Sequence, residues 1–345
     1  MKSRRTLLAA SVIALSGLAA AACSSSSSSS TPAASSSSAA ASSGSSVNLS
    51  SVTLNVGDQK GTGAEAVLKA AGLLSTLPFK VNWSDFTSGP PMLEAMASGS
   101  VDVGGVGDAP PVFAASGGEQ VEIVGARSVP GGDQDALVVP KGSSITSVQQ
   151  LKGKKIAYGS GSSANYHLLT VLNKAGLTTK DVTLVNLQPA NALAAFTSGA
   201  VDAWDIWPPY VQQVVAQDGA KVLAIGSQYG SPYSFEVASK AAVANSEKAA
   251  AIKVYLATLN KAYVFTATHP DVWGAAWGAA SGLPASITTE AAKVDATTPV
   301  TITSAVISSE QNLVTQFYKA GLIPNNVDMS GFITNEFNST VSESG

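Results

Sequence analysis

The sequence predicts an α/β fold, and the spacing of its apolar residues is the main evidence for it. Short apolar runs alternate with helix-length segments from about residue 52 to residue 225. Alternation of this kind is typical of largely parallel sheets that helices cover on both faces. About 295 of the 345 residues have the mixed composition that a packed core needs. That length is enough for two lobes of ordinary size.

The predicted elements follow one another regularly along this body. Apolar or alternating runs indicate strands at residues 52–56, 79–83, 101–106, 121–126 and 136–139. Helices are expected at residues 64–74, at 91–98 and from about residue 111. The second half repeats the rhythm, with strands at 155–158, 182–187, 201–206 and 222–225 and helices at 164–175, 190–198 and 209–216.

Beyond residue 237 the pattern changes to helices without intervening strands. Apolar residues recur at helical spacing through residues 247–268 and 306–320. Helices in such a series usually coat a sheet that was built earlier in the chain. We therefore expect the C-terminal third to pack on the first lobe.

Residues 93–102 and 193–202 echo each other. Both read as a helix, a Ser-Gly end and a strand start that reaches Asp102 or Asp202. A recurrent helix–glycine–strand unit explains the echo without common ancestry. Two similar lobes that face a shared cleft are the alternative, and the sequence leaves both open. In either case we expect the two aspartates to be structural and to hold loop amides at strand starts.

The N-terminus has the features of an export signal. Basic residues precede an apolar run at residues 7–22, which is shorter than the roughly 20 residues that span a membrane. Cys23 follows, and 15 of residues 24–46 are serine, a composition that cannot bury enough surface to fold. The pattern resembles a bacterial lipoprotein, with residues 1–22 as the signal peptide and residues 23–50 as a lipidated Cys23 and a disordered Ser-rich tether. An uncleaved anchor is the alternative, and a twin-arginine signal would change only the export route.

The composition also excludes several classes of site. A single cysteine cannot make an intrachain disulfide, a cysteine-ligated zinc site or an iron–sulfur cluster. His167 and His269 lie in no metal-ligand spacing, so we expect no metal and no other cofactor. Loss of residues 1–22 would remove three of the 20 basic residues and none of the 23 acidic ones, which leaves 17 against 23 and a net charge of −6. A chain of this charge without a basic stripe is not expected to bind nucleic acid.

Three connections between a strand and the following helix are candidate ligand sites, at residues 57–63, 107–111 and 159–166. In open α/β sheets, ligands bind beyond the carboxyl ends of the strands, and helix N-termini offer backbone N–H groups to anions. Residues 159–166 are the most suggestive, because their glycines permit close approach of the backbone and their serines add hydroxyls. An ordinary turn with a serine N-cap is the alternative.

Two further features could serve either a ligand or the core. Trp204 and Trp207 are expected on opposite faces of a strand, so one would pack in the core and the other could line a pocket. Core packing of both is the alternative. Arg127 is the only arginine after the signal and ends a strand-like run. It could grip an oxyanion through two parallel hydrogen bonds, or it could be a solvated hinge residue.

The order and spacing of several motifs resemble the substrate-binding proteins of bacterial uptake transporters for aliphatic sulfonates, a group related to nitrate and taurine binders. The likeness covers residues 52–337 and rests on residues 57–61, 88–95, 107–111, 151–155, 161–166, 201–210 and 317–324. It implies a two-lobed, periplasmic-binding-protein-like (type II) fold with a cleft between the lobes. Lobe 1 would comprise residues 51–134 and 236–345, and lobe 2 would comprise residues 135–235.

The resemblance also implies which residues hold the ligand. In this family, backbone amides and hydroxyls at helix starts hold the sulfonate oxygens. By position, the implied ligand-binding residues are Gln59, Gly107, Asp108, Ala109, Ser162, Ser163, Asn165 and Trp204. We add Arg127 as a candidate and expect no catalytic residue. Members often have His where Asn165 stands and Asp-Pro where Pro208-Pro209 stands, and here the acid is displaced to Asp205.

The function implied by the resemblance is that of an extracytoplasmic solute-binding lipoprotein, a monomer anchored on the outer face of the cell membrane. It would deliver an aliphatic sulfonate to an ABC permease. The alternatives are nitrate, taurine or another small oxyanion as the ligand, an exported desulfinase-like enzyme on the same fold, or a surface protein that binds a protein partner. An enzyme of this kind would need a nucleophile beside a base, and neither histidine adjoins a serine in a recognisable motif. We therefore expect a binding protein and no enzyme.

Overall fold

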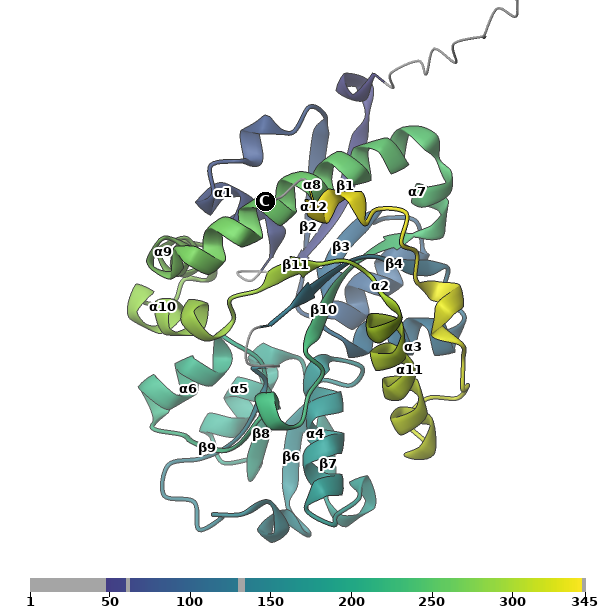
Figure 1. Cartoon of the computed structure of the whole chain (residues 1–345). Helices are drawn as coiled ribbons and strands as arrows, with labels where there is room; N and C mark the ends of the chain where they lie inside the picture. Colours follow the sequence, from purple (N-terminus) through teal and green to yellow (C-terminus); the bar gives the residue numbers. More distant parts are fainter. Residues whose placement is uncertain (1–47, 60–62, 130–133, 343–345) are drawn as a thin grey trace, which may run out of the picture. The chain divides into compact units, whose positions relative to one another are not determined.

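Two β-sheets, each flanked by helices, organise the part of the chain that the structure describes (Figure 1). This computed structural model describes residues 48–59, 63–129 and 134–342. Internal contacts group residues 46–345 into one unit, to which all of these residues belong. The α/β fold class predicted from the apolar spacing is confirmed. The predicted signal peptide, Cys23 and most of the predicted tether lie outside the described residues.

The first sheet has six strands in the order β11-β4-β10-β3-β1-β2. The strands are β1 (Thr53–Gln59), β2 (Lys80–Phe86), β3 (Val103–Val106), β4 (Val121–Ser128), β10 (Tyr233–Ser239) and β11 (Thr298–Val300). β1 pairs in parallel with β2 and β3, whereas β10 runs antiparallel to β3 and β4. Strand β11 continues the sheet antiparallel to β4. The sequence predicts no strand beyond residue 237, so β11 corrects that expectation.

The second sheet has five strands in the order β7-β6-β8-β5-β9. The strands are β5 (Ala136–Val139), β6 (Lys155–Tyr158), β7 (Thr183–Asn186), β8 (Ala203–Ile206) and β9 (Lys221–Ile225). β6 is parallel to β7 and β8, and β5 is antiparallel to β8 and β9. The chain thus leaves the first sheet after β4 and returns to it at β10. The exact limits of the two lobes stay a prediction.

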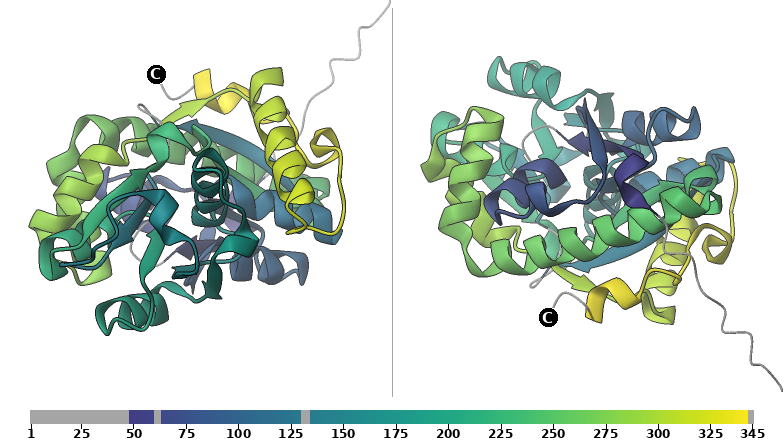
Figure 2. Two further views of the ribbon diagram at one scale, coloured as in Figure 1. Left: turned by 90° about the horizontal axis from the view of Figure 1, so that it is seen from below. Right: turned by 90° about the horizontal axis from the view of Figure 1, so that it is seen from above.

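Helices connect the strands and cover the sheets (Figures 1 and 2). The α-helices are α1 (Ala64–Ala70), α2 (Gly89–Ala97), α3 (Ala109–Gly117), α4 (Ser163–Lys174), α5 (Pro189–Thr197), α6 (Tyr210–Asp218), α7 (Lys240–Ala244), α8 (Ser246–Thr268), α9 (Pro270–Ser281), α10 (Ala285–Val294), α11 (Ser304–Lys319) and α12 (Ser339–Ser342). Short 3₁₀ helices occur at Leu49–Ser51, Leu74–Thr76, Val148–Leu151, Thr179–Asp181, Gly226–Gln228 and Met329–Phe332.

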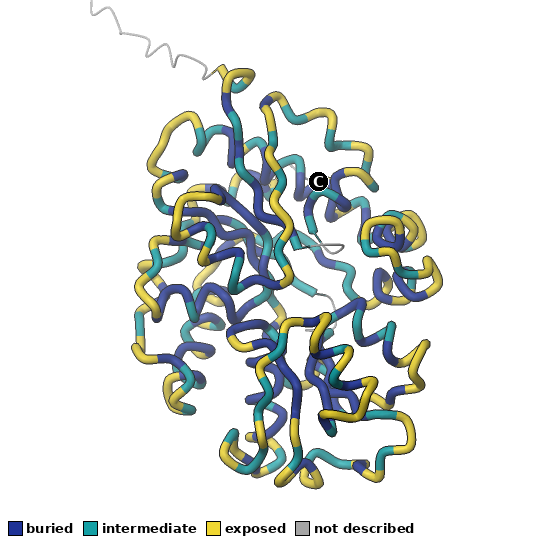
Figure 3. The backbone as a smooth tube through the Cα atoms, turned by 180° about the vertical axis from the view of Figure 1, so that it is seen from behind, coloured by how far each residue is buried: buried dark blue, intermediate teal, exposed yellow. Residues whose placement is uncertain are grey.

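The long helix α8 packs on the first sheet, as the apolar spacing predicts. Ile252 and Leu259 of α8 are fully buried in one cluster with Leu54 and Val56 of β1. Burial of each such side chain stabilises the fold by about 1.5–3 kcal/mol relative to exposure. Figure 3 shows the buried residues gathered in the interior and the exposed residues along the outer turns. The central strands β5 and β8 are wholly buried, whereas the edge strand β2 has no buried residue.

The repeated segment builds the same local structure in both sheets. The Oδ2 atom of Asp102 accepts a hydrogen bond from the backbone N–H of Asn55 in β1 at 2.9 Å. The Oδ2 atom of Asp202 accepts one from the N–H of Lys155 in β6 at 2.8 Å. The structural role predicted for both aspartates is therefore confirmed. Asp102 also pairs with Lys248 of α8 at 2.6 Å, which ties this helix to the first sheet.

Candidate ligand-binding pocket

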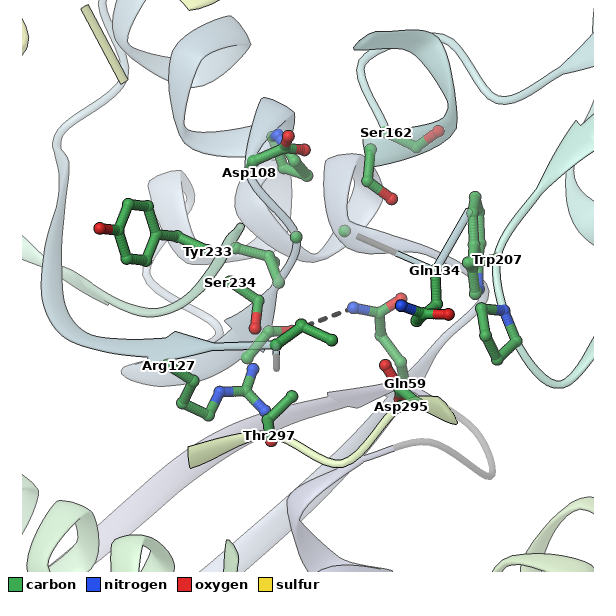
Figure 4. Close-up of a pocket in the computed structure, with 18 of the residues that line it drawn as sticks. Gln59, Asp108, Arg127, Gln134, Ser162, Trp207, Tyr233, Ser234, Asp295 and Thr297 are labelled. Carbon is green, nitrogen blue, oxygen red and sulfur yellow. Dashed lines mark hydrogen bonds between the residues drawn. The ribbon is translucent and has the colours of Figure 1, made fainter. Parts of the chain in front are cut away.

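A polar cavity of about 150 Å³ lies where loops of the two sheets meet. Gln59 of β1 and Arg127 of β4 reach it from the first sheet, and Ser162 and Trp207 reach it from the second. Figure 4 shows Asp108 and Ser162 on one side of the pocket and Arg127 on the opposite side. The pocket lies at the ends of strands and the starts of helices, where ligands of α/β sheets are expected.

Three helices of at least nine residues begin at the pocket, but they do not offer equal numbers of donors. The first turns of α2 and α3 contain Pro90-Pro91 and Pro110-Pro111, which have no N–H groups. Helix α4 has no proline in its first turn, and Ser162 and Ser163 at its start line the pocket. The first N–H groups of α4 have no partners within the helix, so this end suits an anion best.

The loop before α4 is held in shape by its own side chains. Gly161 has a φ of 73°, a left-handed conformation that side chains other than glycine rarely adopt. Its N–H donates to Oδ1 of Asn165 at 3.0 Å, and the hydroxyl of Ser162 donates to the carbonyl of Gly159 at 2.7 Å. Asn165 is buried and does not line the pocket, so it shapes the loop.

The two sheets approach each other closely at this loop. A Cβ atom built on Gly107, which precedes α3, would lie 3.0 Å from the Cβ atom of Ser163 in α4. Thr87 and Ser88, from the loop after β2, both donate to the Oε1 atom of Gln188 before α5, at 2.8 and 3.0 Å. These contacts bring the start of α4 to the wall that the first sheet contributes.

Arg127 is a wall residue of the pocket, which excludes the solvated-hinge alternative. Its side chain is 12% exposed, and its Nη2 atom lies 3.6 Å from Oε1 of Glu236. The guanidinium also lies 4.3 Å from the centre of the Tyr263 ring. Burial alone lowers the pKa of this guanidinium, but the neighbouring Tyr263, Glu236 and Asp295 raise it above its usual value. Arg127 therefore stays charged at the pocket.

Acidic side chains balance this charge. The carboxylate of Asp58 accepts hydrogen bonds from the N–H groups of Gln59 at 2.8 Å and Glu65 at 3.0 Å. Burial nevertheless raises its pKa to about 6. Asp108 caps the N–H of Ala109 at 2.7 Å, and Asp295 lines the opposite side of the pocket (Figure 4). The donors of the pocket thus act beside several carboxylates.

Six of the predicted ligand-binding residues line the pocket and three do not. Those that line it are Gln59, Gly107, Asp108, Arg127, Ser162 and Ser163. Those that do not are Ala109, Asn165 and Trp204. Ala109 follows Asp108 in the chain, is the first residue of α3 and is fully buried. Whether the six lining residues bind a ligand stays a prediction.

Trp204 is placed differently from the prediction. It is fully buried on β8, where its ring packs against Phe196 at 5.9 Å and Tyr210 at 5.8 Å between ring centroids. Trp207, just after the strand ends, lines the pocket in its place. The structure therefore supports the prediction that one tryptophan packs in the core and the other lines a pocket, and not the alternative that both pack in the core.

The acidic residue displaced to position 205 does not face the pocket. Asp205 is fully buried, and its two oxygens lie 2.9 and 3.0 Å from Nδ1 of His167. Burial raises the pKa of this carboxyl, and the nearby His167 opposes the rise. Pro208 lines the pocket instead, so this departure from the family pattern places no acid there.

Several pocket residues were not found from the sequence. Tyr233 and Ser234 come from the start of β10, and Ser231 lies just before that strand. Asp295 and Thr297 come from the segment before β11. The polar start of β10 could have been suspected, because the chain crosses between the predicted lobes there. The segment before β11 carries no motif, and only the return of the chain to the first sheet brings it to the pocket.

Within residues 48–59, 63–129 and 134–342, no three His, Cys, Asp or Glu side chains are grouped so that they could hold a metal ion. In the same part of the chain, no helix has both the length and the apolar character needed to cross a membrane.

Comparison with known proteins gives this architecture a family. The model of the family described as NMT1/THI5 like matches residues 87–272. An aliphatic sulfonates-binding protein of Escherichia coli is 35% identical over 285 residues, which cover 81% of this chain and 88% of that protein. One from Bacillus subtilis is 30% identical and covers 75% of this chain and 77% of that protein.

Solved structures agree with this comparison. The alkanesulfonate-binding protein from Xanthomonas axonopodis pv. citri, bound to MOPS, superposes with a TM-score of 0.77 at 32% identity and covers 83% of this chain and 99% of that chain. A desulfurization enzyme with a TM-score of 0.61 is only 16% identical, so it shares the fold alone.

Two helix-covered sheets that enclose one polar pocket define a substrate-binding protein of the periplasmic-binding-protein-like class. Relatives at 30–35% identity are binding proteins, so the chain belongs with them and not with the enzymes of this fold. More particularly, the chain belongs to the family of sulfonate-binding substrate-binding proteins within the NMT1/THI5-like group.

Proposed function

We propose that this protein binds an aliphatic sulfonate outside the cytoplasm and delivers it to the permease of an ABC importer. The observation that carries the proposal is the pocket itself, in which Arg127 faces the start of α4 across a small cavity (Figure 4). The names of the relatives, which are aliphatic sulfonates-binding proteins, support the choice of ligand.

The donors of the pocket suit the chemistry of a sulfonate. A sulfonate spreads one negative charge over three oxygens, so it needs several hydrogen-bond donors and little net positive charge. The start of α4 offers backbone N–H groups and the hydroxyl of Ser163, and Arg127 offers a fork of N–H groups from the opposite wall. Oriented dipoles of this kind favour an anion even where the whole chain is acidic.

The remaining wall suits a short apolar tail. Val106, Val129 and Trp207 line the same cavity as the donors. A cavity of about 150 Å³ in another protein accommodates benzene, so the space here suits a molecule of that size. We therefore propose a small alkanesulfonate, with its sulfonate on the donors and its carbon chain toward the tryptophan.

The N-terminal sequence supports a proposal for the location of the protein. We propose that residues 1–22 direct export, that Cys23 carries the lipid, and that the Ser-rich tether holds a monomer near the membrane permease. Metabolic labelling with a fatty acid would test this, since the full-length protein should be labelled and a Cys23→Ser variant should not. Label on the variant would contradict the anchor.

The ligand is tested by thermal unfolding with alkanesulfonates, taurine and nitrate in separate titrations. A ligand at 100 times its Kd stabilises the native state by about 2.7 kcal/mol. For a body of about 295 residues, that should raise the Tm by about 4 °C. A rise in Tm with alkanesulfonates alone supports the proposal. A rise with only nitrate or taurine would show that this anion is the ligand instead. No rise with any of them contradicts the proposal.

A further inference from the structure

Glu236 occupies an unusual place in the first sheet. It lies in β10 between β3 and β4, paired with Gly105 on one side and Gly125 on the other, and it is 2% exposed. A Cβ atom on Gly105 would lie 2.9 Å from Oε1 of Glu236, and one on Gly125 would lie 3.4 Å from its Cβ atom. The two glycines therefore leave the space that this carboxylate fills.

The carboxylate lies directly beside the arginine of the pocket. Its Oε1 atom is 3.6 Å from Nη2 of Arg127, and the hydroxyl of Tyr263 donates to the same oxygen at 3.5 Å. The Tyr263 ring in turn lies against the guanidinium, and both Arg127 and Tyr263 line the pocket. The three side chains form one contiguous group at the pocket wall.

The buried carboxylate of Glu236 is not expected to stabilise the fold. The Oε2 atom of Glu236 is buried and has no hydrogen-bond partner among the described residues. Burial of an ionised carboxylate with an unsatisfied oxygen opposes folding, and an apolar side chain in the same space would not carry that cost. A buried acid beside the ligand pocket therefore points to a role in binding.

We propose that Glu236 is a positioning residue, which holds Arg127 at the pocket wall and sets the positive charge that the pocket presents to an anion. This inference rests on the proposed function, since it concerns how the same pocket binds a sulfonate. With Glu236 ionised, Arg127 is largely compensated and attracts the ligand weakly. With Glu236 protonated, the charge of Arg127 is available to the ligand.

The geometry makes ligand affinity depend on pH near neutrality. Burial raises the pKa of Glu236 to about 7, Arg127 opposes the rise and Asp58 adds to it. The groups that face this carboxylate are Arg127 from β4, Tyr255 and Tyr263 from α8, and Asp58 from β1. Burial raises the pKa of both tyrosines, so they stay neutral in this range.

The affinity for an anion should fall as the pH rises. As the pH rises through about 7, Glu236 loses its proton and anion affinity falls. Asp58, with a pKa of about 6, acts in the same direction at lower pH. Measurements between pH 7 and pH 8.5 therefore isolate Glu236, because Asp58 is already ionised there.

The test is calorimetric titration of the protein with ethanesulfonate at several values of pH in that range. Ethanesulfonate stays ionised throughout, so any change comes from the protein. The wild type should bind about threefold to tenfold more weakly at pH 8.5 than at pH 7, since one pKa unit corresponds to tenfold. Glu236→Gln should bind equally at both, and Glu122→Gln should keep the wild-type slope as a control from β4.

Each result is decisive. A flat profile in the wild type, or an unchanged slope in Glu236→Gln, overturns the inference while sulfonate binding stands. Absence of binding at every pH overturns the proposed function itself. If Glu236→Gln fails to fold, the wild type still provides a test at pH 7.5, where titration in buffers of different ionisation enthalpy should show proton uptake on binding. No proton uptake there would overturn the inference.

Discussion

Replacement of Arg127 by glutamine should weaken sulfonate binding by about tenfold to thirtyfold. Loss of a hydrogen bond to a charged group costs about 1.5–3 kcal/mol. The lower part of this range applies, because Glu236 at 3.6 Å already offsets part of the charge. A loss of about 1.5–2 kcal/mol corresponds to the stated change in Kd. Arg127→Lys should lie between the wild type and Arg127→Gln, because it keeps the charge and loses the planar fork.

The assay is calorimetric titration with ethanesulfonate at pH 7, together with urea unfolding of each variant. Lys240→Gln is the matched control, since Lys240 also lies over an aromatic ring, Phe332 at 4.6 Å, but does not line the pocket. This control should bind as the wild type does. If folded Arg127→Gln bound within twofold of the wild type, Arg127 would not be a ligand contact and our reasoning on the pocket would be wrong.

Five further variants test three separate parts of the structure. Gly107→Val should weaken ligand binding by about tenfold, because its side chain would push against the start of α4, and overpacking of this kind typically costs about 1–3 kcal/mol. Gly331→Val is the control, since open space surrounds Gly331 and binding should not change. Calorimetric titration would compare the two variants. Trp204→Ala should lower the free energy of unfolding by about 3–5 kcal/mol, and Trp207→Ala should instead change the preference for chain length among alkanesulfonates. Glu310 is fully buried, both its oxygens are without a hydrogen-bond partner among the described residues, and burial and then Asp108 raise its pKa well above the usual value. The wild type should therefore lose stability as the pH rises above about 4.3. Glu310→Gln should have a higher Tm than the wild type at pH 8 but not at pH 4. An equal difference in Tm at both pH values would show that ionisation of Glu310 is not the cause.

The sequence was sufficient for the fold class because the evidence for it is local. Strand and helix periods alternate through both sheets, and Asp102 and Asp202 mark equivalent strand starts. The misjudged elements depend on distant partners. β11 is three residues long and exists because Thr298 and its neighbours pair with β4, which no local pattern reveals.

Prediction of the pocket residues was limited in the same way, because local patterns could be predicted and distant contacts could not. Loops between a strand and a helix lie at predictable ends of a sheet, so Gln59, Asp108 and Ser162 could be placed at a pocket from the sequence. Strand alternation could not decide which of Trp204 and Trp207 faces the ligand, because β8 is buried on both faces. That choice depends on where the strand ends, and the strand ends at Ile206.

The balance of charges at the pocket is compatible with the proposed binding of an anion by an acidic protein. Glu236 lies beside Arg127 and offsets part of its charge. Asp58 accepts hydrogen bonds from backbone N–H groups through both of its oxygens, and Asp108 accepts one through Oδ1. These bonds keep the loops in place and leave the dipole of α4 to face the cavity. Under the proposed function, selectivity for an anion would come from donors whose directions are fixed by the fold, and Arg127, adjusted by the buried Glu236, would set how tightly the anion is held.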